Sequence, residues 1–301
     1  MKIFNEIGPF RTYLKEITTS GRTIGLVPTM GALHEGHISL IEASKKANDI
    51  TICTIYVNPA QFNNPTDLDK YPRTLEEDAA MLEKVSCDVL LCPSDLEMYP
   101  EKSLLKFDFG HLDKVMEGEF RPGHFSGVAL VVSKLFHICE PDRAYFGQKD
   151  WQQLIIIKRL VNELKFNIDI VCIPIIREAD GLAMSSRNRR LSPELRKQAP
   201  AIRQALEIGA NLLSKGQVAN AVKTAVKQAI ESQTELRVEY VEITDPMNLM
   251  PLSRVDKNTK AIIFVAAFAG DVRLIDNIYL DLLLINSLPN TKASLSTLLT
   301  T

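Results

Sequence analysis

The sequence predicts an α/β fold, a parallel sheet covered by helices, followed by a smaller C-terminal α+β domain. Short apolar runs typical of strands alternate with helical patterns up to residue 175. This alternation favours a parallel sheet with right-handed crossovers. After Ile176 the pattern changes to two helices and three strands, so we place the domains at residues 1–176 and 177–301.

Five runs in the first domain have the apolar composition of buried strands. They are Ile24–Val27, Ile50–Val57, Val89–Leu91, Ala144–Phe146 and Ile168–Ile175. Apolar residues at helical spacing predict helices over Leu75–Val85, Phe125–Cys139 and Trp151–Leu164. Asp150 is placed to cap the last of these. Residues 93–122 contain turn residues and no clear period, which indicates an irregular segment.

The second domain is predicted to contain two helices and three strands. The helices are Pro193–Leu213 and Ala219–Glu231, and the strands are Leu236–Thr244, Ala261–Phe268 and Val272–Ile278. Pro193 suits the first turn of a helix, because its missing N–H would have no partner there. Residues 286–301 lack a firm hydrophobic period and are predicted to form a loose tail.

Composition excludes several classes of protein. The chain has 46% apolar and 24% charged residues, as ordinary globular proteins do. Its 35 basic and 37 acidic residues give a formal net charge of −2, so no global basic field indicates a nucleic-acid partner. No apolar run reaches the roughly 20 residues that span a bilayer, and the first residues lack a signal-peptide core. We therefore expect no membrane partner and a cytoplasmic location.

The cysteines predict structural thiols. The chain has five, at positions Cys53, Cys87, Cys92, Cys139 and Cys172. Their number is odd, most lie in apolar runs, and no Cys-x-x-Cys pair occurs. Burial as free thiols is the expected state, and a metal or redox role is the alternative.

A strand, a turn and a helix are predicted around residues 24–47, with the turn at Met30–His37. A turn at the carboxyl end of a strand in an open α/β sheet binds nucleotides, because free N–H groups at the start of the next helix attract phosphate. His34 and His37 are three residues apart, so both imidazoles can face one ligand. The turn matches neither the Gly-x-Gly-x-x-Gly fingerprint nor a Walker loop, and taken alone it also fits simple turn chemistry.

Uncharged amides follow the second predicted strand. Asn58 and Gln61 offer paired hydrogen-bond donors and acceptors, which suit the hydroxyl and carboxylate of a hydroxy acid. The alternative is that each is a polar loop residue bonded to backbone.

Two further groups of polar residues suit a nucleotide. In Gly147–Gln153, Lys149 can meet a phosphate, Asp150 can accept from ribose hydroxyls, and Gln153 lies one helical turn further on. In Met184–Arg187, two hydroxyls and a guanidinium form a clamp suited to a triphosphate. A solvated lysine and a solvated interdomain linker are the respective alternatives.

Taken together and in this order, the motifs resemble the pantothenate synthetase (pantoate–β-alanine ligase) family. The matching stretches are Pro28–His37, Val57–Pro59 with Gln61–Phe62, Tyr71–Arg73, Arg121–Phe125, Gly147–Asp150 with Gln153, Ser185–Asn188 and Arg273–Asn277. The chain departs from the family pattern at Gln148, where glutamate is frequent, and at Ala60, where a larger residue is common. It also continues further past Asn277 than the family leads us to expect.

The resemblance implies a Rossmann-like nucleotidyltransferase domain, a small C-terminal domain and a homodimer. It implies that ATP, pantoate and β-alanine give pantothenate, AMP and pyrophosphate through a pantoyl adenylate, with Mg²⁺ and with no metal-ligating residue assigned. The implied catalytic residues are His34, His37, Lys149 and Arg187. The implied ATP-binding residues are Met30, Gly31, Ala32, Leu33, His34, Glu35, Gly36, His37, Gly147, Gln148, Lys149, Asp150, Ile176, Met184, Ser185, Ser186 and Arg187. The implied substrate-binding residues are Gln61, Gln153 and Asn58.

Two other functions use the same residues. A tRNA-handling synthetase could be built on the same nucleotide site, but the second domain is short and the chain is not basic. A metal-binding module could use the five histidines, His34, His37, His111, His124 and His137, but the usual supporting Cys/His pairs are missing.

Overall fold

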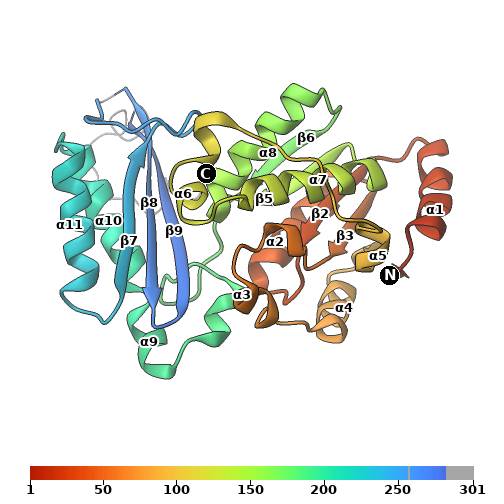
Figure 1. Ribbon diagram of the computed structural model, residues 1–301, viewed down its shortest axis with the longest axis horizontal. Helices are drawn as coiled ribbons and strands as arrows, with labels where there is room; N and C mark the ends of the chain where they lie inside the picture. Colours follow the sequence, from red (N-terminus) through yellow and green to blue (C-terminus); the bar gives the residue numbers. More distant parts are fainter. Residues whose placement is uncertain (257, 283–301) are drawn as a thin grey trace. The chain divides into compact units, whose positions relative to one another are not determined.

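The computed structural model describes residues 1–256 and 258–282, and the chain divides into two compact units, residues 1–173 and the part from Pro174 onwards (Figure 1). Each unit has its own sheet and its own hydrophobic core. The predicted tail at 286–301 lies outside the described residues. No helix in the described part of the chain is both long and apolar enough to cross a membrane.

The first unit is built on a six-stranded sheet in the order β1-β4-β3-β2-β5-β6. The strands are β1 (Lys2–Phe4), β2 (Ile24–Thr29), β3 (Ile50–Ile55), β4 (Val89–Leu91), β5 (Arg143–Gly147) and β6 (Asp169–Ile173). All neighbouring strands pair in parallel, which confirms the predicted parallel sheet. The prediction missed β1, a largely exposed edge strand whose three residues are too few to show a strand period.

Helices cover both faces of this sheet. The helices of this unit are α1 (Ile7–Thr19), α2 (Glu35–Ala47), α3 (Pro65–Asp69), α4 (Leu75–Lys84), α5 (Asp95–Met98), α6 (Glu117–Phe120), α7 (His124–Cys139) and α8 (Trp151–Leu164). Alternate strand residues point to opposite faces. Leu26 packs with α1, α7 and α8, whereas Val27 packs with α2 and α4. The prediction missed α1, although its buried Phe10, Leu14 and Ile17 have helical spacing.

The strand order reverses between β2 and β5. From β2 the chain adds β3 and β4 on one side, and it then places β5 and β6 on the other side. In an open α/β sheet, ligands bind outside the carboxyl ends of the strands at such a switch point. The segments that follow Thr29 and Gly147 are therefore the natural place for a site.

The second unit has a three-stranded antiparallel sheet, β7 (Arg237–Thr244), β8 (Lys260–Ala269) and β9 (Val272–Asp281). Its helices are α9 (Pro193–Gln198), α10 (Ala201–Ser214) and α11 (Ala219–Glu231). The prediction of one helix over Pro193–Leu213 was wrong. The helix is interrupted at Ala199 and Pro200, because a proline ring has no N–H and clashes inside a helix.

The five cysteines are all free thiols, as predicted. Cys53, Cys87 and Cys139 are buried, and the other two are half-buried. Burial raises the pKa of the Cys87 thiol to about 11, so it stays protonated at neutral pH.

Candidate active site

The loop after β2 passes through an unusual backbone conformation before it enters α2. Gly31 and Ala32 both have positive φ, 78° and 50°. Ala32 and Leu33 are fully buried, and their N–H groups donate to the carboxylate of Asp78. These two predicted ATP-binding residues therefore direct their amides into the protein.

The two histidines of this loop cap α2 with their own rings. His34 Nδ1 accepts from the N–H of Gly36 at 3.1 Å, and His37 Nδ1 accepts from the N–H of His34 at 3.3 Å. An imidazole that accepts at Nδ1 carries its proton on Nε2 when neutral. The sequence led us to expect that free amides at this helix start would meet phosphate, and this expectation needs correction. The N–H groups of Gly36 and His34 are bonded to imidazole nitrogens. Imidazole N–H groups therefore take the place of these two amides.

The rings of His34 and His37 lie side by side, with centroids 4.1 Å apart. Burial, with a smaller contribution from the positive charge of Lys149, lowers the pKa of His37 from 6.5 to about 4. His37 is therefore a neutral hydrogen-bond donor at pH 7. Because Lys149 contributes to this pKa shift, its charge lies close enough to the imidazole to interact with it.

Lys149 is positioned by the end of β5, the strand beside β2. The chain leaves β5 at Gly147 and turns through a short 3-10 helix, Gln148–Asp150, into α8. Asp150 is exposed and occupies the N-cap position, but its side chain makes no capping hydrogen bond, so that prediction was wrong. Its backbone, with ψ near 53°, does not have the extended conformation in which a cap side chain reaches the helix N–H groups.

Gln61 is held in place by a network of buried hydrogen bonds. Its Nε2 donates to the sulfur of Met30 at 3.0 Å, and its Oε1 accepts from Asn58 at 3.1 Å. Asn58 is 1% exposed and also bonds Gly127 O, Ala60 N and the hydroxyl of Tyr99. Because these partners occupy both the donor and the acceptor end of the Asn58 amide, this side chain orients Gln61.

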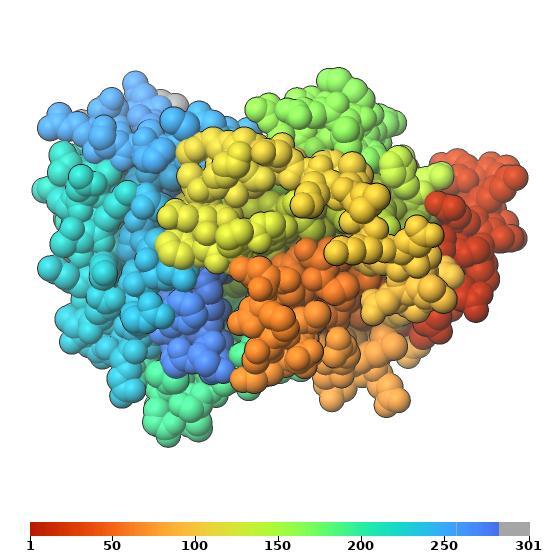
Figure 2. Space-filling model, viewed as in Figure 1, coloured from red at the N-terminus to blue at the C-terminus, as the bar shows by residue number. Residues whose placement is uncertain are grey.

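A second network supports Gln61 through its backbone. The buried ring of His124 bonds the carbonyl oxygen of Gln61 at 2.9 Å, and its other nitrogen lies 3.2 Å from Arg121. Arg121 in turn pairs with the buried carboxylate of Glu117. At the surface, the segments around residues 60 and 120 (orange and yellow) lie against each other (Figure 2). Arg121 and His124 were part of the family motif, whereas nothing in the sequence had singled out Glu117.

Neighbouring glutamines at the start of α8 differ in their surroundings. Gln152 is 3% exposed and bonds Leu112 O, Val115 O and Glu117 N, so it ties the irregular segment to α8. Sequence reasoning had missed this residue. Gln153 is half-buried, and no hydrogen bond engages its side chain within residues 1–256 and 258–282.

Five of the predicted ATP-binding residues belong to the second unit, namely Ile176, Met184, Ser185, Ser186 and Arg187. The N–H of Met184 donates to Ile176 O at 3.0 Å, which joins two of them directly. Ser185 accepts from the N–H of Arg187 and opens a 3-10 helix, Ser186–Arg190. The backbone thus presents the serine–arginine sequence as one rigid turn.

A buried ion pair braces the segment before this turn, where Arg177 and Ala183 form an antiparallel bridge. Arg177 donates to both carboxylate oxygens of Asp276, at 2.7 and 3.0 Å, and Asp276 is 4% exposed. Asp276 belongs to the last stretch of the family motif, and through Arg177 it supports this segment.

Among the described residues, no group of three or more His, Cys, Asp or Glu side chains could hold a metal ion. His124 instead supports Gln61, and His137 contacts the ring of Phe166. The histidines therefore do not assemble into a centre of the kind that the metal-binding alternative required.

Comparison with known proteins identifies the family. The model of the pantoate–β-alanine ligase family matches residues 2–279. Pantothenate synthetases from Porphyromonas gingivalis and Moorella thermoacetica are 46% and 44% identical, over 92% and 93% of this chain and 99% of each relative.

Solved structures agree with this assignment. The pantothenate synthetase of Thermus thermophilus matches with a TM-score of 0.86 and 40% identity, over 94% of this chain and 99% of that one. The pantoate–β-alanine ligase of Francisella tularensis, complexed with β,γ-ATP and β-alanine, matches with a TM-score of 0.78 and 36% identity, over 92% and 97% of the two chains. The chain belongs to the pantoate–β-alanine ligase family.

Proposed function

We propose that this chain joins pantoate to β-alanine at the expense of ATP, releasing AMP and pyrophosphate. The observation that carries the proposal is the cluster of His34, His37 and Lys149 at the switch point of a parallel sheet, in a member of this ligase family. A carboxylate is a poor acyl donor until one of its oxygens becomes a good leaving group, and transfer of AMP to that oxygen supplies one.

In the first step, a pantoate carboxylate oxygen attacks the α-phosphorus of ATP and pyrophosphate leaves. Negative charge then builds on the departing phosphates. His34 and His37 donate Nε2–H hydrogen bonds to phosphate oxygens, and Lys149 supplies positive charge. This role agrees with the low pKa of His37, because only a neutral ring can accept the His34 N–H at Nδ1 while it donates from Nε2.

Gln61 and Gln153 are the residues that we assign to pantoate, with Gln61 also near β-alanine. The orientation of Gln61 is supported by Asn58, which holds its Oε1 and leaves Nε2 on the Met30 sulfur, a weak acceptor that a substrate oxygen can replace. We therefore assign Asn58 an indirect role in substrate binding. In the second step the β-alanine amine attacks the acyl carbon, the amide forms and AMP leaves.

The second unit contributes the turn Met184–Arg187, with Ile176 beside it, to the nucleotide in this proposal. The capped turn at Ser185 and the charge of Arg187 support a phosphate-binding role. Mg²⁺ suits ATP-dependent phosphate chemistry, and the chain offers no carboxylate cage for it among residues 1–256 and 258–282. We propose that Mg²⁺ binds with the phosphates of ATP and keeps several of its water ligands.

We also propose a homodimer and a cytoplasmic location. Leu104 and Leu105 are 90% and 60% exposed on a stretch without helix or strand, and contact with a second copy would bury them. The five unpaired thiols are typical of a reducing compartment.

Pyrophosphate exchange tests the first step. The purified protein is incubated with ATP, Mg²⁺ and labelled pyrophosphate, with or without pantoate and without β-alanine. We expect label to enter ATP only when pantoate is present, because only an adenylated acid can run the step backwards. Exchange without pantoate, or no exchange under either condition, would contradict the proposed function.

A further inference from the structure

The loop between β2 and α2 is held in a conformation that its own residues do not favour. Gly31 and then Ala32 have positive φ, and a side chain on Cβ makes that region unfavourable for Ala32. A non-glycine residue stays there only when the surrounding structure holds it. The sequence of the loop alone does not supply such a restraint.

Asp78 supplies the restraint from 45 residues further along the chain. Its Oδ1 accepts from Leu33 N at 2.7 Å, and its Oδ2 accepts from Ala32 N at 2.9 Å. Asp78 lies in the first turns of α4 and is 1% exposed, and Thr74 donates to the same carboxylate at 3.3 Å. One buried carboxylate thus binds both successive amides of the strained segment.

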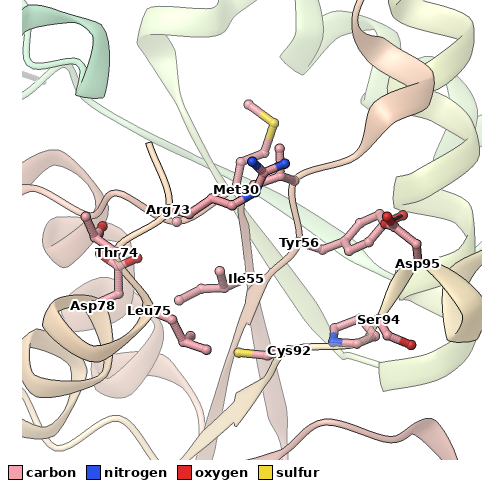
Figure 3. Close-up of a pocket in the computed structure, with 13 residues that line it drawn as sticks. Met30, Ile55, Tyr56, Arg73, Thr74, Leu75, Asp78, Cys92, Ser94 and Asp95 are labelled. Carbon is pink, nitrogen blue, oxygen red and sulfur yellow. Dashed lines mark hydrogen bonds between the residues drawn. The ribbon is translucent and has the colours of Figure 1, made fainter. Parts of the chain in front are cut away.

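Gly31 fits closely against this carboxylate. A Cβ at Gly31 would lie 3.0 Å from Asp78 Oδ2 and 3.1 Å from Ile55. Gly31, Ile55 and Asp78 also line a cavity of about 310 Å³. Figure 3 shows Ile55 and Asp78 among its lining residues. The loop is therefore held from one side by α4 and β3, and it continues directly into His34.

We propose that Asp78 is a positioning residue for the reaction, because it fixes the loop from which His34 and His37 project. His34 follows Leu33 immediately, and its N–H is the donor that orients the His37 ring. A shift of the loop moves both imidazoles relative to the phosphates. The inference rests on the proposed function of this histidine pair.

Three variants test the proposal. Asp78→Ala removes both acceptors, and the adjacent cavity lets water reach the released amides. Asp78→Asn keeps one acceptor oxygen and turns an NH₂ group toward the other amide. Asp88→Ala is the matched control, because Asp88 also accepts a backbone N–H, from Thr51 at 2.8 Å, but it lies at the amino ends of β3 and β4, whereas the histidine loop follows the carboxyl end of β2.

The measurements are kcat and KM for ATP, pantoate-dependent pyrophosphate exchange, and titration of the His37 ring by NMR. We expect Asp78→Ala to lower kcat and exchange about a hundredfold, the effect of a misplacement near 1 Å. The KM for ATP should change less than kcat. Asp78→Asn should give an intermediate loss, and Asp88→Ala should retain wild-type kcat. In Asp78→Ala the pKa of His37 should rise toward 6.5 as its ring gains access to water.

Failure of the Asp78 proposal and failure of the proposed function give different experimental results. If folded Asp78→Ala has wild-type kcat and an unchanged His37 titration, Asp78 serves only stability and the inference is wrong. If Asp88→Ala loses as much kcat as Asp78→Ala, the effect is not specific to the loop and the inference is also wrong. If the wild-type protein shows no pantoate-dependent exchange, the proposed function itself fails.

Discussion

At the scale of single residues, His37 shows how burial sets chemistry. Its ring is neutral at pH 7 because burial opposes charge, and the nearby Lys149 opposes it further. A cationic imidazole would bind phosphate more strongly, but protonating the buried ring would cost free energy. The site instead separates the two tasks, with charge on Lys149 and hydrogen-bond donation on the histidines.

We expect the His37 ring to titrate near pH 4 in the folded protein. Lys149→Met should raise this pKa, because a positive charge is removed, but not to 6.5, because burial is the larger cause. NMR of the histidine ring protons between pH 8 and 3.5 measures both values. A wild-type midpoint near 6.5 would contradict the prediction.

The same shift gives a pH dependence of stability. The unfolded ring takes up a proton near pH 6.5, and the folded ring does so only near pH 4. The contribution of His37 to the free energy of unfolding is therefore fully present above pH 6.5 and declines as the pH falls toward 4. Comparing wild type with His37→Gln in urea titrations at pH 7 and pH 5 isolates it.

His37→Ala should reduce pantoate-dependent exchange about a hundredfold or more, because one preorganised donor is lost. His137→Ala is the control, since His137 lies exposed at the end of α7. Near-normal exchange in His37→Ala would remove this residue from the mechanism.

Gln152 and Gln153 are neighbours with separable effects. We expect Gln153→Ala to raise the KM for pantoate about tenfold while the KM for ATP changes little, since one hydrogen-bonding group to pantoate is lost. Gln152→Ala should instead lower the melting temperature, because it leaves buried groups of the 112–117 segment unpaired. Steady-state kinetics and thermal unfolding of both variants check this division. Unchanged pantoate dependence in Gln153→Ala would contradict its assigned role.

At the scale of elements, the site depends on how closely α7 approaches the segment after β3. A Cβ at Gly127 would lie 2.1 Å from the carbonyl oxygen of Ala60 and 2.7 Å from the amide nitrogen of Gln61. Only glycine allows this contact, because both neighbours are backbone atoms. The same contact lets Asn58 bond Gly127 O and so orient Gln61.

Gly127→Ala should therefore destabilise the protein by about 1–3 kcal/mol and impair the use of pantoate, because the backbone at Gln61 must move. Gly8→Ala is the control, since a Cβ at Gly8 in α1 would meet nothing within 4 Å. Urea unfolding and the KM for pantoate measure the two effects. Equal stability of the two variants would show that the contact can relax without cost.

At the scale of the whole molecule, the exposed Leu104 and Leu105 bear on assembly. Light scattering should give twice the 33.7 kDa of one chain for the wild type. Leu104→Glu with Leu105→Glu should give a single chain, because burying two carboxylates at an interface is unfavourable. Met247→Glu is the control, with an apolar side chain 63% exposed in the second unit. A monomeric wild type would refute the homodimer.

The predictable part of the fold followed from local patterns. Five of the six parallel strands and the helices α7 and α8 have apolar residues at the expected spacing. Prediction failed where that signal was weak or was overlooked, at the exposed strand β1 and at α1. It also failed where Pro200 interrupted a continuing helical pattern.

By itself, the sequence determined the class of fold, the order of its elements and the motifs of the ligase family, because strand and helix periods and the residue types that bind phosphate are local properties of the chain. Only the tertiary structure decided which residues support the site. Asp78 binds the amides of Ala32 and Leu33 across 46 and 45 residues, and His124 in α7 bonds the carbonyl oxygen of Gln61 across 63 residues. The physical reason is that burial and hydrogen-bond partners depend on packing between distant segments, and no local pattern encodes them.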